Sequence, residues 1–151
     1  MKQSNQYIAA LALSALGTIG SAEMCRDCAP EVESLLDSTN PYIRKKVRPP
    51  TIAFTQKQAA LAAVRILRKV PELMESFSAK VKSLLSEKNH GVLVTGTCLA
   101  VEMVKMDKSV LETFRKLVPH LVKLFSSLIQ YGFSPEYNVG GVTDPFLQVK
   151  I

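Results

Sequence analysis

The feature that most constrains the fold is an internal repeat. Residues 32–43 (V-x-S-L-L-x-x-x-N-P-x-I) match residues 81–92 (V-x-S-L-L-x-x-x-N-H-x-V) position for position, at an offset of 49 residues. The apolar spacing and the polar turn recur further on, at Leu121, Leu124 and Phe125 and then at Asp144-Pro145-x-Leu147. Helices joined by a polar turn and repeated about every 40 residues are typical of stacked helical hairpins of the HEAT or armadillo kind. The repeat therefore predicts an all-α fold, a right-handed α–α superhelix.

Apolar periodicity and the positions of proline place the individual helices. Pro30, Pro71 and Pro119 each stand where a first helical turn is expected, because the amide hydrogen that proline lacks has no partner in that turn. Helices are expected at each of these prolines, and a further helix is expected from about residue 56 to 69. The best strand candidate, residues 92–95, runs directly into a helical stripe, so no sheet is expected.

The first residues imitate a targeting signal. Met1-Lys2 precedes an apolar stretch over residues 7–19, and small residues follow at 20–22. The stretch is shorter than the roughly 20 apolar residues that span a membrane. Polar residues 3–6 weaken the resemblance to a signal peptide, and three cysteines are too few for a disulfide scaffold. We therefore expect a buried helix over residues 7–19 followed by a Ser21-capped helix, with no signal peptide and no transmembrane helix.

The cysteines form no recognisable metal or redox site. Cys25 and Cys28 are spaced as CxxC, but a structural zinc ion takes four ligands and no second CxxC or histidine pair accompanies them. A thioredoxin-like redox pair would require a βαβ context, which the helical pattern does not provide. No metal and no cofactor are therefore expected.

The remaining polar motifs also indicate structural and not catalytic roles. Asn40 and Asn89 are expected to be helix caps or turn residues, and His90 and His120 surface or cap residues. Gly140-Gly141 is interpreted as a flexible connection, because no Lys-Ser or Lys-Thr follows it. No phosphate loop, HExxH motif or nucleophile elbow is present in the sequence. The chain is therefore predicted not to be an enzyme.

Positive charge is concentrated in the middle of the chain. The net charge is +6, and residues 41–90 hold 11 basic and 3 acidic side chains. A nucleic acid, an anionic lipid surface or an acidic protein partner could use such a region, and solvated helix faces would have the same composition. The candidate basic surface for a partner or anionic lipid consists of Arg44, Lys45, Lys46, Arg65, Arg68 and Lys69.

Long runs of the sequence resemble one protein family. The runs are Asn5-Gln6-Tyr7-Ile8, residues 21–27 (SAEMCRD), 43–46 (IRKK) joined to 59–61 (AAL), 68–75 (RKVPELME), 87–93 (EKNHGVL), 114–119 (FRKLVP) and 144–151 (DPFLQVKI). Together they resemble the trunk of the gamma-adaptins, large subunits within the adaptin N-terminal family. The resemblance covers nearly the whole chain outside residues 47–58.

The resemblance implies a structural subunit of a clathrin-associated adaptor complex that acts in vesicle-mediated intracellular protein transport. It implies assembly with sigma, medium and beta-type adaptor subunits and recruitment by an Arf-type GTPase and phosphoinositide. Clathrin would be contacted only indirectly, and no nucleic acid is expected. The implied location is cytoplasmic, peripheral on trans-Golgi network and endosome membranes and on clathrin-coated vesicles. Another HEAT or armadillo scaffold, coatomer-like or acting in nuclear transport, is the alternative.

The chain is expected to be one solenoid fragment over residues 1–151, truncated at both ends and exposing apolar surface there. Within it, residues 47–58 form an atypical insert that departs from the family pattern. Pro49 and Pro50 are expected to break a helix, so that residues 47–55 loop out and the helix starts near Gln56. Two origins for the insert remain open, a translated intron and a lineage-specific loop.

Overall fold

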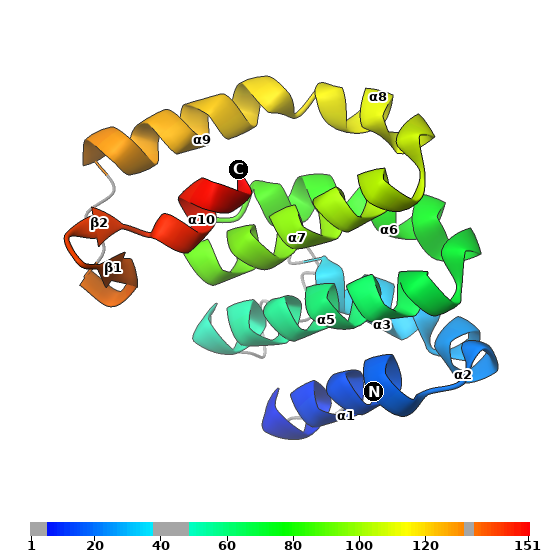
Figure 1. Ribbon diagram of the computed structural model, residues 1–151. Helices are drawn as coiled ribbons and strands as arrows, with labels where there is room; N and C mark the ends of the chain where they lie inside the picture. The colour runs from blue at the N-terminus through cyan, green and yellow to red at the C-terminus, as the bar shows by residue number, and fades with distance from the viewer. Residues whose placement is uncertain (1–5, 38–48, 132–134) are drawn as a thin grey trace.

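The computed structural model describes residues 6–37, 49–131 and 135–151 (Figure 1). Its helices are α1 (Gln6–Ile19), α2 (Ala22–Asp27), α3 (Ala29–Leu36), α5 (Pro49–Lys69), α6 (Met74–Leu85), α7 (His90–Met106), α8 (Leu111–Arg115), α9 (Val118–Tyr131) and α10 (Pro145–Lys150). Short 3₁₀ turns lie at η1 (Pro71–Leu73), η2 (Lys108–Val110) and η3 (Pro135–Tyr137). The predicted all-α, HEAT/armadillo-like fold class is confirmed.

The helices are arranged in two layers. Helix α1 packs on α5, α5 packs on α7, and α7 packs on α10, while α3 and α6 lie against each other behind them (Figure 1). Helix α9 crosses the top of the stack in Figure 1. Each helix therefore contacts mainly its neighbours in the stack, as the repeat predicts.

Most of the buried side chains belong to one continuous apolar core that extends from Leu13 on α1 to Phe114 on α8. Small residues on α5, such as the fully buried Ala59 and Ala63, let the neighbouring helices approach closely. A Cβ atom added at Gly96 on α7 would lie 2.9 Å from Leu84 Cβ on α6, so this crossing requires a residue without a side chain. A second, smaller cluster contains Leu93, Leu128 and Leu147.

Several predicted helix starts are confirmed. Ser21 Oγ accepts a hydrogen bond from the Met24 amide at 3.2 Å and caps α2. Asn89 Oδ1 accepts from the Val92 amide at 3.2 Å and caps α7, within which the rejected strand candidate lies. Asn40 lies outside the described residues.

The prediction of no sheet is wrong for one short segment. Strands β1 (Asn138–Val139) and β2 (Val142–Thr143) form an antiparallel hairpin. Gly140 and Gly141 connect them with φ of +59° and +82°. A two-residue hairpin loop with positive φ at both positions suits the right-handed twist of the strands and favours glycine. The glycine pair thus closes a tight turn and is not a flexible connection.

The prediction that residues 47–55 loop out is also wrong for residues 49–55, while residues 47 and 48 lie outside the described residues. Helix α5 begins at Pro49 and runs for 21 residues to Lys69. Pro49 and Pro50 occupy its first two positions, where a missing amide hydrogen removes no intrahelical bond, so they start the helix and do not break it. Gln56, only 3% exposed, donates from Nε2 to the Leu36 carbonyl at 3.4 Å and connects this part of α5 to the end of α3.

Candidate functional site

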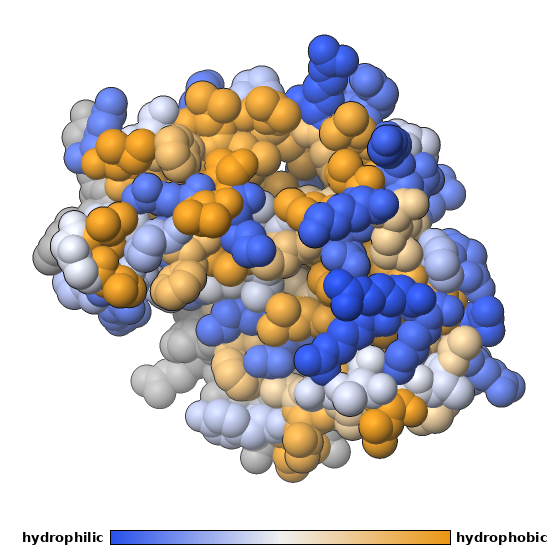
Figure 2. Space-filling model, in the orientation of Figure 1, coloured by the Kyte–Doolittle hydropathy of each residue, from blue (hydrophilic) through white to orange (hydrophobic). Residues whose placement is uncertain are grey.

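Half of the predicted basic surface lies on the last turns of α5. Arg65, Arg68 and Lys69 are three and four residues apart, so α5 brings them together on one side of the helix. Figure 2 shows hydrophilic side chains gathered over α5 and α7 on this face of the molecule. Arg44, Lys45 and Lys46 lie outside the described residues.

Arg65 and Lys69 both reach the end of α1. Arg65 Nη1 donates to Thr18 Oγ1 at 2.6 Å. Lys69 Nζ donates to the Gly20 carbonyl at 2.9 Å and to the Thr18 carbonyl at 3.2 Å. Carbonyl groups at a helix C-terminus carry partial negative charge, which favours a cation there. These two cations therefore fasten α1 to α5.

Arg68 is directed toward α7. Its Nε donates to Glu102 Oε1 at 2.6 Å, and the Glu102 side chain is 17% exposed. The hydrogen bond from Arg68 holds the pKa of the Glu102 carboxyl below its ordinary value and raises the pKa of Arg68. Arg65, Arg68 and Lys69 thus all have partners within the chain. Binding of an anionic lipid or an acidic partner at the six predicted residues stays a prediction.

Exposed apolar side chains lie at both ends of the described stack, and the prediction of a buried helix over residues 7–19 is wrong for one side of α1, which no other described helix covers. On α1, Tyr7, Leu11 and Ile19 are 67%, 72% and 82% exposed. A groove of about 430 Å³ lies between α1, α2 and α3, with a mostly apolar lining that also includes Asp27 and Glu31. At the other end, Phe146 and Val149 on α10 are 69% and 85% exposed.

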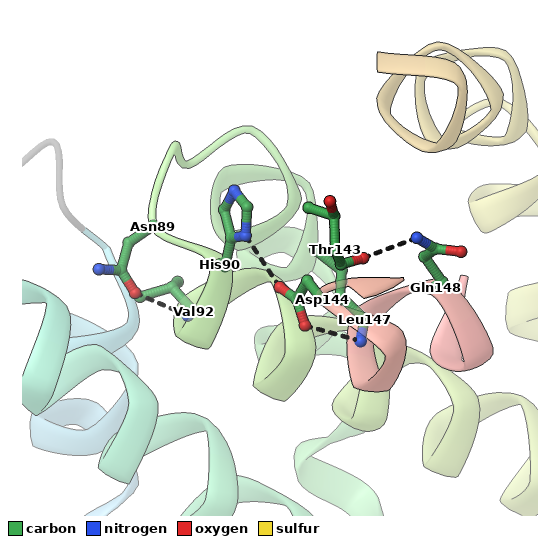
Figure 3. Close-up of polar contacts among 7 residues, drawn as sticks. All are labelled: Asn89, His90, Val92, Thr143, Asp144, Leu147 and Gln148. Carbon is green, nitrogen blue, oxygen red and sulfur yellow. Dashed lines mark hydrogen bonds and ion pairs between the residues drawn. The ribbon is translucent and has the colours of Figure 1, made fainter. Parts of the chain in front are cut away.

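One polar site was missed by the sequence analysis. The prediction of His90 as a surface or cap residue is wrong, because Asn89 is the cap and the His90 side chain is only 20% exposed. His90 Nδ1 lies 2.8 Å from Asp144 Oδ2, and the two side chains point toward each other from the starts of α7 and α10 (Figure 3). The two residues are 54 positions apart, so no local motif announces the pair.

His120 behaves as predicted. It is exposed, and its Nε2 lies 2.9 Å from the Leu85 carbonyl at the end of α6. A histidine donor at a helix C-terminus satisfies a carbonyl that lacks an intrahelical partner. His120 is therefore a cap residue for α6.

The cysteines are free thiols. Cys25 is fully buried and its Sγ donates to the Leu16 carbonyl at 3.8 Å, while Cys28 stands at the N-cap position of α3. Across residues 6–37, 49–131 and 135–151, no three or more His, Cys, Asp or Glu side chains are grouped so that they could hold a metal ion. Among the helices described, none is both long and apolar enough to span a membrane.

Comparison with known proteins identifies the family. A family model described as "Adaptin N terminal region" matches residues 1–151, the whole chain. The chain belongs to the adaptin N-terminal family. The resemblance found in its sequence is thereby confirmed.

The relatives compared within the adaptin N-terminal family are all named as gamma-type subunits of AP-1 complexes. The chain is 48% identical over 148 residues to the AP-1 complex subunit gamma of Dictyostelium discoideum, which covers 98% of the chain and 15% of that relative. It is 49% identical over 152 residues to AP-1 complex subunit gamma-2 of Arabidopsis thaliana, covering 100% of the chain and 16% of that relative. It is 44% identical over 151 residues to AP-1 complex subunit gamma-like 2 of Homo sapiens, and the alignment covers 100% of the chain and 18% of that relative. The chain therefore spans less than a fifth of the length of these relatives.

Proposed function

We propose that this chain is part of the trunk of a gamma-type large subunit in a clathrin-associated adaptor complex. Such a subunit works in vesicle-mediated protein transport by assembly and membrane recruitment, without enzymatic chemistry. The observation that carries the proposal is the 44–49% identity, over nearly the whole chain, to proteins named as gamma subunits of AP-1 complexes. The stacked helical hairpins support it, because a solenoid offers extended surfaces for several partners.

The proposed partners are sigma, medium and beta-type adaptor subunits. An Arf-type GTPase and phosphoinositide would bring the assembly to the membrane, and clathrin would be contacted only indirectly. The proposed location is the cytoplasmic face of trans-Golgi network and endosome membranes. The exposed apolar side chains on α1 and α10 support an assembled state, since such surface is usually covered in a working protein.

Affinity purification from cells tests this assignment. The chain is expressed with a tag at its natural level, and the proteins that copurify with it are identified by mass spectrometry. Sigma, medium and beta-type adaptor subunits are expected in the eluate. Recovery of coatomer subunits or nuclear-transport factors in their place would contradict the proposal. A matched control is the tagged chain carrying Leu84→Ala, which weakens the core and should lose the partners.

The basic surface is proposed to support membrane attachment. Flotation with vesicles that contain or lack phosphoinositide measures it. Charge reversal at Arg44, Lys45 and Lys46 is tested separately from reversal at Arg65, Arg68 and Lys69, because the second set also holds helices together. Lipid binding would be removed from the proposal if charge reversal at Arg44, Lys45 and Lys46 left flotation unchanged. Equal flotation with and without phosphoinositide would also remove it.

We also propose that residues 47–58 are an addition to the family pattern, either a translated intron or a lineage-specific segment. Sequencing of the transcript and its gene separates the two origins. A dominant, ribosome-bound message that retains all 12 codons, without intron boundaries in the gene, would favour a lineage-specific segment. Splicing of these codons from the main message would favour an intron.

A further inference from the structure

A cluster of polar and aromatic side chains fastens the connection between α9 and α10 to the start of α7. His90 Nδ1 donates to Asp144 Oδ2 at 2.8 Å, and Asp144 is only 3% exposed (Figure 3). On its other side, the imidazole ring stacks on the Tyr137 ring, with centroids 4.9 Å apart and an angle of 26° between the planes. His90 is thus held between two residues of one connection.

Asp144 uses all of its polar groups in this arrangement. Its Oδ1 accepts from the Leu147 amide at 3.1 Å and caps α10. Its own amide donates to the Tyr137 carbonyl at 3.0 Å, which closes the segment that contains the hairpin. Asp144 has a φ of +43°, the left-handed region that residues other than glycine adopt when their surroundings require it. The contacts of Asp144 therefore fix the hairpin, the start of α10 and α7 relative to one another.

The apolar packing in the same place is small. Among the described residues, this cluster has three buried leucines, Leu93, Leu128 and Leu147, each from a different helix, with Val94, Leu124 and Ile151 partly buried against them. The core of α1 to α8, in contrast, is one continuous cluster of many residues. Because so little apolar surface joins α10 to α7, the polar contacts carry a large share of the attachment.

We propose that His90, Tyr137 and Asp144 form a latch, and that residues 137–151 open and close on α7 as a unit while α1 to α7 stay folded. Opening of the latch breaks the His90–Asp144 hydrogen bond and removes Leu147 from the small cluster. The latch is a conformational device of the part of the stack where α10 meets α7, and it does not depend on the proposed adaptor function.

Hydrogen–deuterium exchange of the 151-residue chain, read by mass spectrometry, tests the latch. His90→Leu removes the donor, while His90→Asn keeps an amide nitrogen near the position of Nδ1. Asp144→Asn removes the charge but keeps an acceptor for the Leu147 amide and tolerates the left-handed backbone. In His90→Leu, exchange over residues 138–150 is expected to rise about tenfold, the change expected from losing one hydrogen bond to a charged group. Exchange over residues 138–150 should rise less in His90→Asn. Exchange over α5 should be unchanged in every variant.

The matched control is Glu112→Gln, the same carboxylate-to-amide change in an exposed pair with Arg115. It should leave exchange over residues 138–150 unchanged. Unchanged exchange in both His90→Leu and Asp144→Asn would overturn the latch. An equal rise over α5 would also overturn it, because the pair would then support the whole fold. In the double variant His90→Leu/Asp144→Asn, exchange over residues 138–150 should be little faster than in either single variant. If the effects of the two single variants add in full, the two residues act separately and do not form a latch.

Discussion

The two ends of the described chain are held together in different ways. From α1 to α8, a continuous apolar core runs through the stack, and the cations of α5 connect neighbouring helices at its surface. Where α9 and α10 meet α7, a small cluster of three buried leucines is supplemented by polar contacts, among them the part-buried hydrogen bond between His90 and Asp144. The first region draws its stability from area removed from water, and the second from a few directional bonds. The two regions should therefore differ in how far a local change spreads.

The largest expected effect compares one substitution in the two regions. Leu84→Ala in the main core should lower the free energy of unfolding by about 2–5 kcal/mol, because it leaves a cavity that its neighbours cannot fill. Leu147→Ala should leave the main unfolding transition almost in place and loosen α10 alone. Urea denaturation followed by circular dichroism measures the first effect, and amide exchange over α10 measures the second.

The exposed Leu111→Ala is the control for both substitutions, with a small effect expected at 49% exposure. If Leu147→Ala shifts the main transition as far as Leu84→Ala does, the chain is one cooperative unit. The distinction between the two regions would then be wrong.

A smaller effect is expected where two helices of the first region cross. Gly96→Ala puts a methyl group 2.9 Å from Leu84 Cβ, on a side chain without freedom to move away. Overpacking of this kind costs about 1–3 kcal/mol, more than the gain in helix propensity. Thermal melting measures the loss. Gly17→Ala is the control, because the nearest atoms that its methyl group would meet lie farther away, Arg65 Cδ at 3.2 Å and Arg65 Cβ at 3.3 Å, so this substitution should cost less.

The features that could be predicted from the sequence depend on residues close together in the chain, and those that could not depend on residues far apart. Apolar periodicity and first-turn prolines predicted α3, α6, α7 and α9 correctly, because those signals come from residues close in the chain. Pro49-Pro50 was misread as a helix break, since proline acts as a start or a stop according to where the helix begins. The His90–Asp144 contact could not be predicted, because it joins residues that only the folded stack brings together. The hydrogen bonds from Arg65 and Lys69 to the end of α1 could not be predicted either, because they also join residues that are far apart in the sequence.

The hairpin of the second region gives the next test. Gly140→Ala and Gly141→Ala place side chains at φ of +59° and +82°, where a left-handed conformation costs about 1–2 kcal/mol per residue. Nothing lies within 4 Å of either added Cβ, so the cost is conformational alone. Exchange over residues 138–143 should rise while the melting temperature of the first region stays the same. A fall in that melting temperature would contradict the separation of the two regions.

The smallest expected effect concerns the surface contacts of the first region. The pKa of Glu102 is lowered by its hydrogen bond from Arg68, so this pair stabilises the fold above the ordinary glutamate pKa of 4.5. As the pH falls through the lowered pKa, Glu102 takes up a proton and that contribution is lost. Arg68→Gln should therefore reduce the stability difference between neutral pH and a pH well below 4.5. Glu102→Gln should do the same, and the double variant should add nothing further, because both single variants remove the same contact. An unchanged pH dependence of urea midpoints in both variants would show that Arg68 and Glu102 contribute nothing to this region, which the apolar core would then hold alone.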